Sequence, residues 1–347
     1  MLAIGVMLIS LVLSKLLGAI LPFEKNPVSP LLVTIIMGLL IRNLIPLPEI
    51  IQPGISFGIK KVLRFGIILM GIRLSLGSVL KIGVLAVGMV FVCITGALLI
   101  VYGLSRLLKV NSRLGMLIAA GTSICGVSAI VATSPTIGAT EEETSYAVGV
   151  ITLFGLLATA CYPFLVELVF HFDVFQAGFF LGTSIHDTSQ VTAASLIYNQ
   201  LWDRVTASGL TGADIAITTK LVRNTFMIVV IPLLGFVYRN RSEGMTQRKK
   251  TAIIPLFVIG YLLMGGVRTL GDIVFTESEL WITVHQTIKE TATYFIAVAV
   301  ASVSLNTQLA KLKRLGFKPL LVGLIAALSL GLISFVLVNL FHARILL

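Results

Sequence analysis

The chain has 347 residues, of which 57% are hydrophobic and only 12% are charged. A soluble domain carries about 25% charged residues, so this composition excludes a water-soluble protein and indicates an all-α polytopic membrane protein. The formal net charge of +11 would suggest nucleic acid as the partner of a soluble protein. Here the basic residues lie between apolar runs, as in membrane proteins, so no nucleic-acid partner is expected.

Long runs with few or no charges predict about 11 transmembrane helices, because roughly 20 apolar residues cross a bilayer. The first run is interpreted as a helix and not as a cleavable signal peptide, since no basic region precedes it and Lys15 interrupts it. Only short loops separate the runs, so residues 1–347 are expected to form one integral membrane domain with approximate halves 30–170 and 174–343. The predicted helices are 1–21, 30–46, 62–80, 82–105, 114–138, 144–168, 174–200, 216–238, 251–268, 282–306 and 319–341.

Four basic clusters lie between the predicted helices, and positive loops stay in the cytoplasm. All four share that side if the N-terminus is cytoplasmic and the C-terminus periplasmic, and Glu141–Glu143 then lies outside. The loop with Glu167 and Asp173 fits badly, because it would be cytoplasmic. If the fifth and seventh segments were re-entrant instead of spanning, this loop would be outside and the basic clusters would keep their side. The clusters are Arg42 with Lys60, Lys61 and Arg64; Arg106, Lys109 and Arg113; residues 239–250; and residues 311–318.

Two similar polar stretches interrupt membrane-length apolar runs, namely GTSICGVSAI from Gly121 and GTSIHDTSQV from Gly182. Hydrocarbon offers such a backbone no hydrogen-bond partners, so both segments are predicted to break at mid-membrane and to line one cavity. Broken helices at this depth are the usual substrate sites of transporters. A weaker sequence similarity between residues 65–83 and 294–316 favours inverted repeats. The candidate substrate-binding residues here are Thr122, Ser123, Cys125, Gly126, Ser128, Thr183, Ser184, Thr188, Ser189 and Gln190.

Ionisable residues at bilayer depth are rare and costly, and they are functional by default. His186 and Asp187 are therefore interpreted as a protonatable pair that couples protons to transport, the alternative being a structural pair that ties the broken helix to its neighbours. Lys220, Arg223 and Asn224 are candidate contacts of an anion, the alternative being charges that only flank a helix.

Two further sites stay open at this stage. Arg73 either holds an anion or extends its charge to the membrane interface. Lys289 and Glu290 are interpreted as interfacial charges. The three cysteines Cys93, Cys125 and Cys161 show no metal-ligand spacing, so no metal site is expected.

The two GTSI motifs, the FGIILMGIRLSLG segment and the KLVRNTFM segment resemble the YeiH-type, or sulfate exporter, family of bacterial inner-membrane proteins over nearly the whole chain. The resemblance implies opposed five-helix repeats, broken crossing helices and a core domain that moves against a scaffold in elevator fashion. It implies no cofactor and a multi-pass location in the bacterial inner membrane.

The residue observations favour a secondary transporter of a small anion, with protons as the candidate coupling ion. The resemblance implies sulfate or an organosulfonate as that anion, and export as the direction. Serine and threonine hydroxyls and the N-termini of broken helices suit an anion. The alternatives are an anion channel and, less favoured, an intramembrane hydrolase that uses Ser123 or Cys125 with His186. The expected partners are the anion and the lipid bilayer, and a homodimer is a candidate assembly.

Overall fold

The computed structural model describes residues 1–20, 29–171, 173–207, 209–239, 256–275, 278–308 and 317–345. Helices dominate these residues, and no strand occurs among them apart from one isolated bridge between Val205 and Thr211. The predicted all-α membrane fold is confirmed. By length and composition, five of the described helices can each cross a membrane, and the pair α11–α12, bent by 41°, makes a sixth crossing if counted as one.

Ten of the 11 predicted segments overlap one described helix or a pair of consecutive helices. The segment 62–80 instead takes in Leu63–Met70, Gly71–Arg73 and the start of Leu76–Leu107, so one helix runs through the predicted break at residue 81. The elements are α1 Leu2–Ile20, α2 Pro30–Leu44, η1 Glu49–Ile51, α3 Gln52–Phe57, η2 Gly58–Val62, α4 Leu63–Met70, η3 Gly71–Arg73, α5 Leu76–Leu107, α6 Ser112–Ser123, α7 Val127–Ile137, α8 Glu141–Val169, α9 Val174–Ser184, α10 Thr188–Trp202, α11 Gly212–Thr225, α12 Met227–Arg239, α13 Leu256–Val274, α14 Glu279–Asn306 and α16 Phe317–Ile345.

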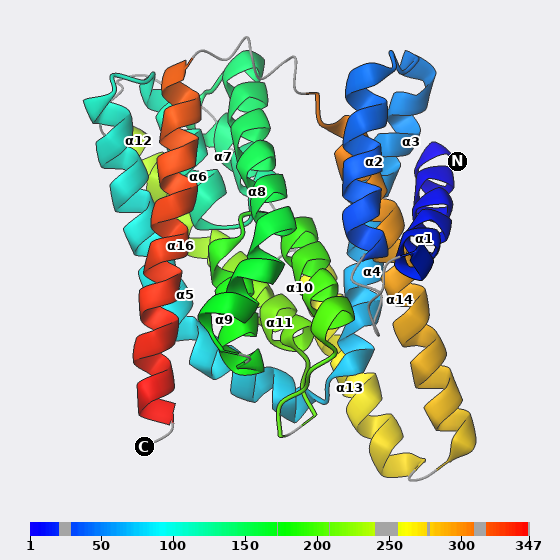
Figure 1. Ribbon diagram of the computed structural model, residues 1–347. Helices are drawn as coiled ribbons and strands as arrows, with labels where there is room; N and C mark the ends of the chain where they lie inside the picture. The colour runs from blue at the N-terminus through cyan, green and yellow to red at the C-terminus, as the bar shows by residue number, and fades with distance from the viewer. Residues whose placement is uncertain are drawn as a thin grey trace. The chain divides into compact units, whose positions relative to one another are not determined.

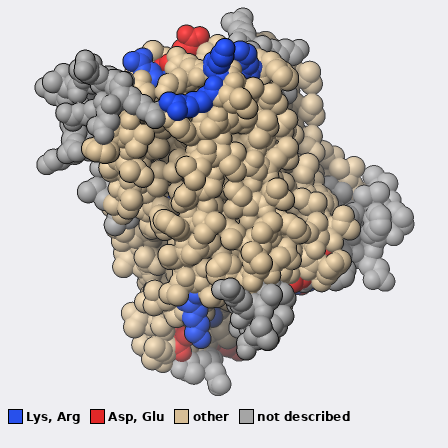
Figure 2. Space-filling view, turned by 90° about the vertical axis from the view of Figure 1, so that its left-hand side faces the viewer, with Lys and Arg blue, Asp and Glu red and all other residues tan. Residues whose placement is uncertain are grey.

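Charged side chains avoid the middle of the molecular face shown in Figure 2. Lysine, arginine, aspartate and glutamate side chains gather at its two ends, and a wide band without them lies between. A band of this kind suits the hydrocarbon of a bilayer, which accepts apolar side chains and excludes charges.

The chain forms two compact units. Unit 1 contains residues 1–82, 192–214 and 256–309. In it, α14 packs against α2 and α4, while α13 packs against α4 and η3 (Figure 1). Gly71 lets η3 approach α13 closely, because a methyl group at this position would collide with the carbonyl of Tyr261.

Unit 2 contains residues 83–191, 215–255 and 310–347. Here α16 packs against α6, α8 and α9, and α12 packs against α7. Cys93, Ala97 and Leu330 form a buried apolar cluster, as the interpretation of Cys93 as a packing residue expects. The predicted halves each contribute to both units, and the division between the units falls within α5, α10 and α11.

Helices α6 and α7 form a hairpin that returns to the end of unit 2 from which it starts. They pack against each other, and Gly121 near the end of α6 faces Ile130 near the start of α7. At the open end of the hairpin, Nε of Arg113 donates a hydrogen bond to the Tyr238 hydroxyl at 3.1 Å, and Glu143 lies close enough to Arg113 for their charges to interact.

The hairpin bears on one prediction about topology. Glu143 lies close enough to Arg113 for their charges to interact, which favours the re-entrant alternative for the fifth segment over the assignment of Glu141–Glu143 to the side opposite the 106–113 cluster. The acidic residues have a local role in α8. Its first turn is acidic, and Thr140 and Glu143 form a reciprocal capping box, so these carboxylates stabilise a helix N-terminus. Most of the basic clusters 239–250 and 311–318 lie outside the described residues.

Candidate binding site at the crossing of two broken helices

The first predicted break separates α6 from α7. Helix α6 ends at Ser123, and Ile124 leaves the helical conformation with φ −119° and ψ −96°. Gly126 has φ +67°, a conformation that glycine adopts readily and that strains residues with a side chain. The glycine-rich sequence therefore reverses the chain within three residues, and α7 begins at Val127.

The second predicted break separates α9 from α10. Ile185 is extended, with φ −82° and ψ 142°, and Asp187 caps the new helix. Asp187 Oδ1 accepts hydrogen bonds from the Ser189 amide at 2.9 Å and from the Ser189 hydroxyl at 2.6 Å, while Gln190 Oε1 accepts the Asp187 amide at 3.1 Å. This is a reciprocal capping arrangement, in which a carboxylate meets the positive end of a helix dipole.

The two breaks meet in unit 2. A methyl group added to Gly126 would lie 3.0 Å from both Cβ and Oδ2 of Asp187. The N-termini of α7 and α10 therefore converge on the Asp187 carboxylate, which is partly exposed. The structure thus brings the two GTSI motifs together, as their polar backbones require.

Lys220 joins the two breaks from a third helix, α11. Its side chain is fully buried, and Nζ donates hydrogen bonds to the carbonyls of Ile124 at 3.0 Å, of Ile185 at 2.9 Å and of His186. An ammonium group has three protons, so these three carbonyls engage all of them.

Arg223, three residues further along α11, is also fully buried and does the same for the ends of α6 and α9. Its Nε donates to the Ser123 carbonyl at 2.8 Å and its NH2 to the Thr122 carbonyl. Its NH1 donates to the Thr183 carbonyl at 2.7 Å. The last carbonyls of a helix have no partner within the helix, and hydrocarbon supplies none. Two cations from one helix thus satisfy the carbonyl ends of both half-helices.

The remaining candidate residues are held in different ways. Ser123, Thr183 and Ser184 donate to carbonyls of their own helices, and Asn224 Nδ2 donates to the Thr188 hydroxyl at 3.1 Å. Ser128 is exposed on the first turn of α7. The Cys125 thiol is buried, 3.2 Å from the Met227 sulfur, and Gln190 Nε2 donates to the Thr152 carbonyl at 3.2 Å.

Several polar atoms in the crossing have no hydrogen-bond partner among the described residues. They are both ring nitrogens of His186, Oδ1 of Asn224, and Oγ1 of Thr122 and of Thr219. Each of these side chains is buried, and a buried polar group without a partner costs about 1–3 kcal/mol. Sequence reasoning missed Thr219, although it directly precedes Lys220. Unpartnered groups concentrated in this way mark the crossing as the place where a polar ligand or water is expected.

A hydrolase of this kind needs a nucleophile that is hydrogen-bonded to a general base. Ser123, Cys125 and His186 are arranged differently. Ser123 Oγ donates to the Ala120 carbonyl at 3.3 Å, and Cys125 contacts Met227. Neither residue is hydrogen-bonded to His186, whose ring nitrogens have no partner in the described part of the chain. Within that part, no group of three or more histidine, cysteine, aspartate and glutamate residues is arranged to hold a metal ion.

Comparisons with known proteins agree on one family. The sequence model of conserved hypothetical protein 698 matches residues 2–323. The chain is 34% identical to a UPF0324 membrane protein of Bacillus anthracis over 96% of its own length and 93% of that protein. It is 32% identical to a UPF0324 membrane protein of Fusobacterium nucleatum, with 92% and 91% of the two chains covered. No solved structure matches the chain.

Proposed function

The chain belongs to the family of conserved hypothetical protein 698, which is the YeiH-type family of membrane proteins, and from that premise we propose that it is a secondary transporter of a small anion such as sulfate or an organosulfonate. The observation that carries the proposal is the place of Asp187, whose carboxylate lies at the N-termini of two half-helices in a membrane protein. We propose that the anion is transported out of the cell.

Helix N-termini favour negative charge, because their free N–H groups and the helix dipole both attract it. Two such ends converge in the crossing, and the Asp187 carboxylate now takes the position that a substrate anion would prefer. Lys220 and Arg223 support this arrangement indirectly, since their contacts are with carbonyls. Ser128, Thr188, Asn224 and His186 supply neutral groups in the same crossing, and the ring nitrogens of His186 have no hydrogen-bond partner among the described residues.

Proton coupling follows because the Asp187 carboxylate and the substrate anion would compete for the same position at the N-termini of α7 and α10. An ionised Asp187 repels an anion from the N-termini of α7 and α10, and a protonated Asp187 removes that repulsion while Ser189 still holds its side chain and Gln190 its backbone amide. Anion and proton would then bind together and leave together. Alternating access would move unit 2, which contains the whole crossing, in the elevator fashion expected of the family.

Flux measurements on the full chain in liposomes test this function. Vesicles loaded with unlabelled sulfate or methanesulfonate should accumulate the labelled anion by exchange, and a pH gradient should drive net uptake. Leak down any anion gradient without exchange would indicate a channel, and chemical conversion of a supplied ester would indicate a hydrolase. If neither anion moves faster than in protein-free vesicles, the proposed transport of these anions is wrong.

A further inference from the structure

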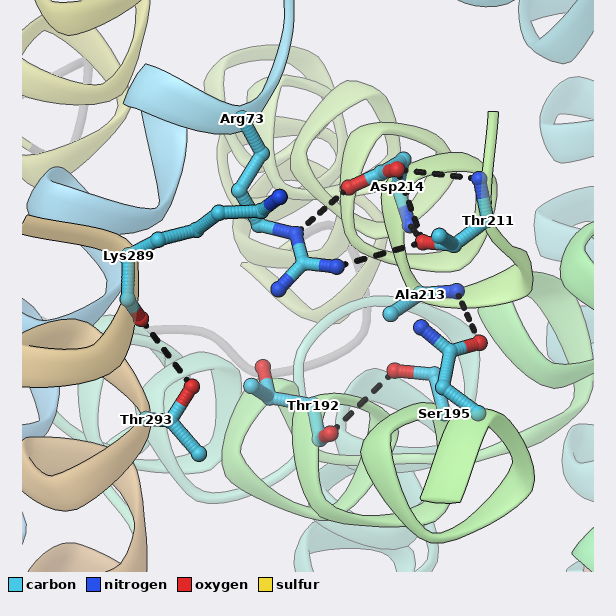
Figure 3. A network of polar contacts seen from close by, with 9 residues as sticks. Arg73, Thr192, Ser195, Thr211, Ala213, Asp214, Lys289 and Thr293 are labelled. Carbon is cyan, nitrogen blue, oxygen red and sulfur yellow. Dashed lines mark hydrogen bonds and ion pairs between the residues drawn. The ribbon is translucent and has the colours of Figure 1, made fainter. Parts of the chain in front are cut away.

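Unit 1 contains a second group of charged residues, separate from the crossing. Arg73 is the last residue of η3, Lys289 lies in α14, and Asp214 lies in the first turn of α11, with Thr211 just before it. Figure 3 shows the Lys289 side chain extending toward Arg73, with Asp214 and Thr211 on the other side of the guanidinium. The other labelled residues with a hydroxyl are Thr192 and Ser195 of α10 and Thr293 of α14, whose hydroxyl donates to the Lys289 carbonyl at 3.1 Å.

The Asp214 carboxylate is already engaged on both oxygens. Oδ1 accepts a hydrogen bond from Arg73 Nε at 2.8 Å, and Oδ2 accepts the Thr211 amide at 3.0 Å and the Thr211 hydroxyl at 2.7 Å. The side chains of Arg73 and Asp214 are only 12% and 6% exposed, so Arg73 points into the protein. Asp214 therefore neutralises Arg73 and caps α11 at the same time.

Among the described residues, no carboxylate is paired with the Lys289 ammonium. The charged groups that act on Lys289 are Arg73, Asp214 and Arg268. Arg268 is paired with Asp272 at 2.7 Å, and Arg73 with Asp214, so each carboxylate of this group already has its own arginine. The Lys289 ammonium and the NH1 group of Arg73 donate no hydrogen bond to any described residue. Two cationic groups with free N–H donors thus lie together on helices that build a membrane protein, where unbalanced charge is costly.

We propose that Arg73 and Lys289 form an oxyanion-binding site, which takes the sulfate or sulfonate group of the transported substrate at a position other than the crossing. A guanidinium edge and an ammonium group together match the oxygens of a tetrahedral oxyanion, and such charge-assisted hydrogen bonds are the strong ones. Asp214 limits the net charge of the site, so the anion is held without being trapped. This inference rests on the proposed function only for the identity of the anion as transported substrate.

Binding of labelled inorganic sulfate to the purified full chain tests the site without any transport step. Lys289→Gln removes the ammonium without breaking a side-chain hydrogen bond to any described residue, so the variant is expected to fold, and its thermal unfolding checks this. Its sulfate Kd should rise about tenfold or more, the loss typical of one charged hydrogen bond. Lys289→Arg should stay within about threefold of the wild type, since it keeps the charge and the donors.

Lys81→Gln is the matched control, because Lys81 is an exposed lysine of unit 1 on α5. Equal sulfate Kd values for Lys289→Gln and Lys81→Gln would overturn the inference, as would a wild-type chain that binds neither sulfate, methanesulfonate nor phosphate. A wild-type chain that binds sulfate through Lys289 but moves no anion across vesicles would contradict the proposed transport and leave this site standing.

Discussion

The Asp187 carboxylate lies against Gly126, so that a methyl group on the glycine would come within 3.0 Å of Asp187 Oδ2. The two residues come from different broken helices, each of which begins a new half-helix at this point. One carboxylate therefore faces two helix N-termini, and the predictions below begin with the consequences of this contact.

Asp187→Asn is expected to abolish uptake driven by a pH gradient while leaving anion exchange within a few fold of the wild type. Asparagine is as good a helix cap as aspartate, so α10 should remain capped, but the proton site is lost. Liposome assays with and without the gradient measure both activities. Asp173→Asn is the matched control, because Asp173 caps α9 through the Gln176 amide at 2.9 Å, away from the crossing. A structural role alone for Asp187 would reduce exchange and driven uptake alike.

His186→Gln is expected to weaken the pH dependence of driven uptake without abolishing exchange. The imidazole is buried in the crossing without a hydrogen-bond partner among the described residues, and glutamine keeps a polar group of similar reach that cannot take up a proton near neutral pH. Uptake rates between about pH 5 and 8 provide the measurement. If His186→Gln and Asp187→Asn both respond to the gradient as the wild type does, these residues only tie helices together.

Gly126→Ala is expected to lower stability by about 1–3 kcal/mol, because alanine strains the backbone at φ +67° and its methyl group would crowd Asp187. Thermal unfolding in detergent measures the effect. Gly103→Ala is the control, since nothing lies within 4 Å of a methyl group at this position in α5. Equal unfolding temperatures for the two variants would show that the contact of Gly126 with Asp187 does not constrain the fold.

Lys220→Met is expected to destabilise the chain by about 3 kcal/mol or more, because three buried carbonyls lose their donor. The measurement is the unfolding temperature alongside the sulfate Kd of the folded fraction. A direct substrate contact would produce the opposite pattern, with weaker sulfate binding and unchanged stability. Lys81→Met controls for the loss of a lysine on the surface of a helix.

Glu142→Cys and Lys109→Cys are expected to react with membrane-impermeant thiol reagents from the same side of the membrane. The α6–α7 hairpin places the start of α8 beside the start of α6, and both introduced cysteines lie at that end of unit 2. The unmodified chain, which contains an exposed Cys161, provides the background. Labelling of the two positions from opposite sides would show that α6 and α7 cross the membrane as a single span.

Much of the fold could be predicted from the sequence, because the signals are local. Apolar runs predicted the long helices, but they missed α3 and placed a break near residue 81, inside the continuous α5. The polar Gly-Thr-Ser sequences predicted both breaks, since hydrocarbon cannot satisfy such a backbone. The side on which Glu141–Glu143 lies could not be predicted in the same way. An acidic first turn serves a helix N-terminus wherever that helix begins, and acidic residues say little about topology.

The contacts within the candidate site were harder to predict, because they join residues far apart in the sequence. The sequence left Lys220 and Arg223 open as contacts of an anion or as charges that flank a helix, whereas their bonds are to backbone carbonyls roughly a hundred residues away in the first break. Every residue has a backbone carbonyl, so the residue types in a sequence do not predict which carbonyl will accept a hydrogen bond. Arg73 and Lys289 lie on separate helices, and their proximity likewise depends on how those helices pack.

The division between the two units falls inside continuous helices, close to the crossing. Helix α10 passes from unit 2 to unit 1 after Val191, four residues beyond Asp187, and α11 passes from unit 1 to unit 2 after Asp214, six residues before Lys220. Helices resist bending, so a shift of the first turn of α10 or of Lys220 must be transmitted along a rigid path of one or two turns. Asp187 and Lys220 are each joined to the other unit by continuous helix, without any intervening loop.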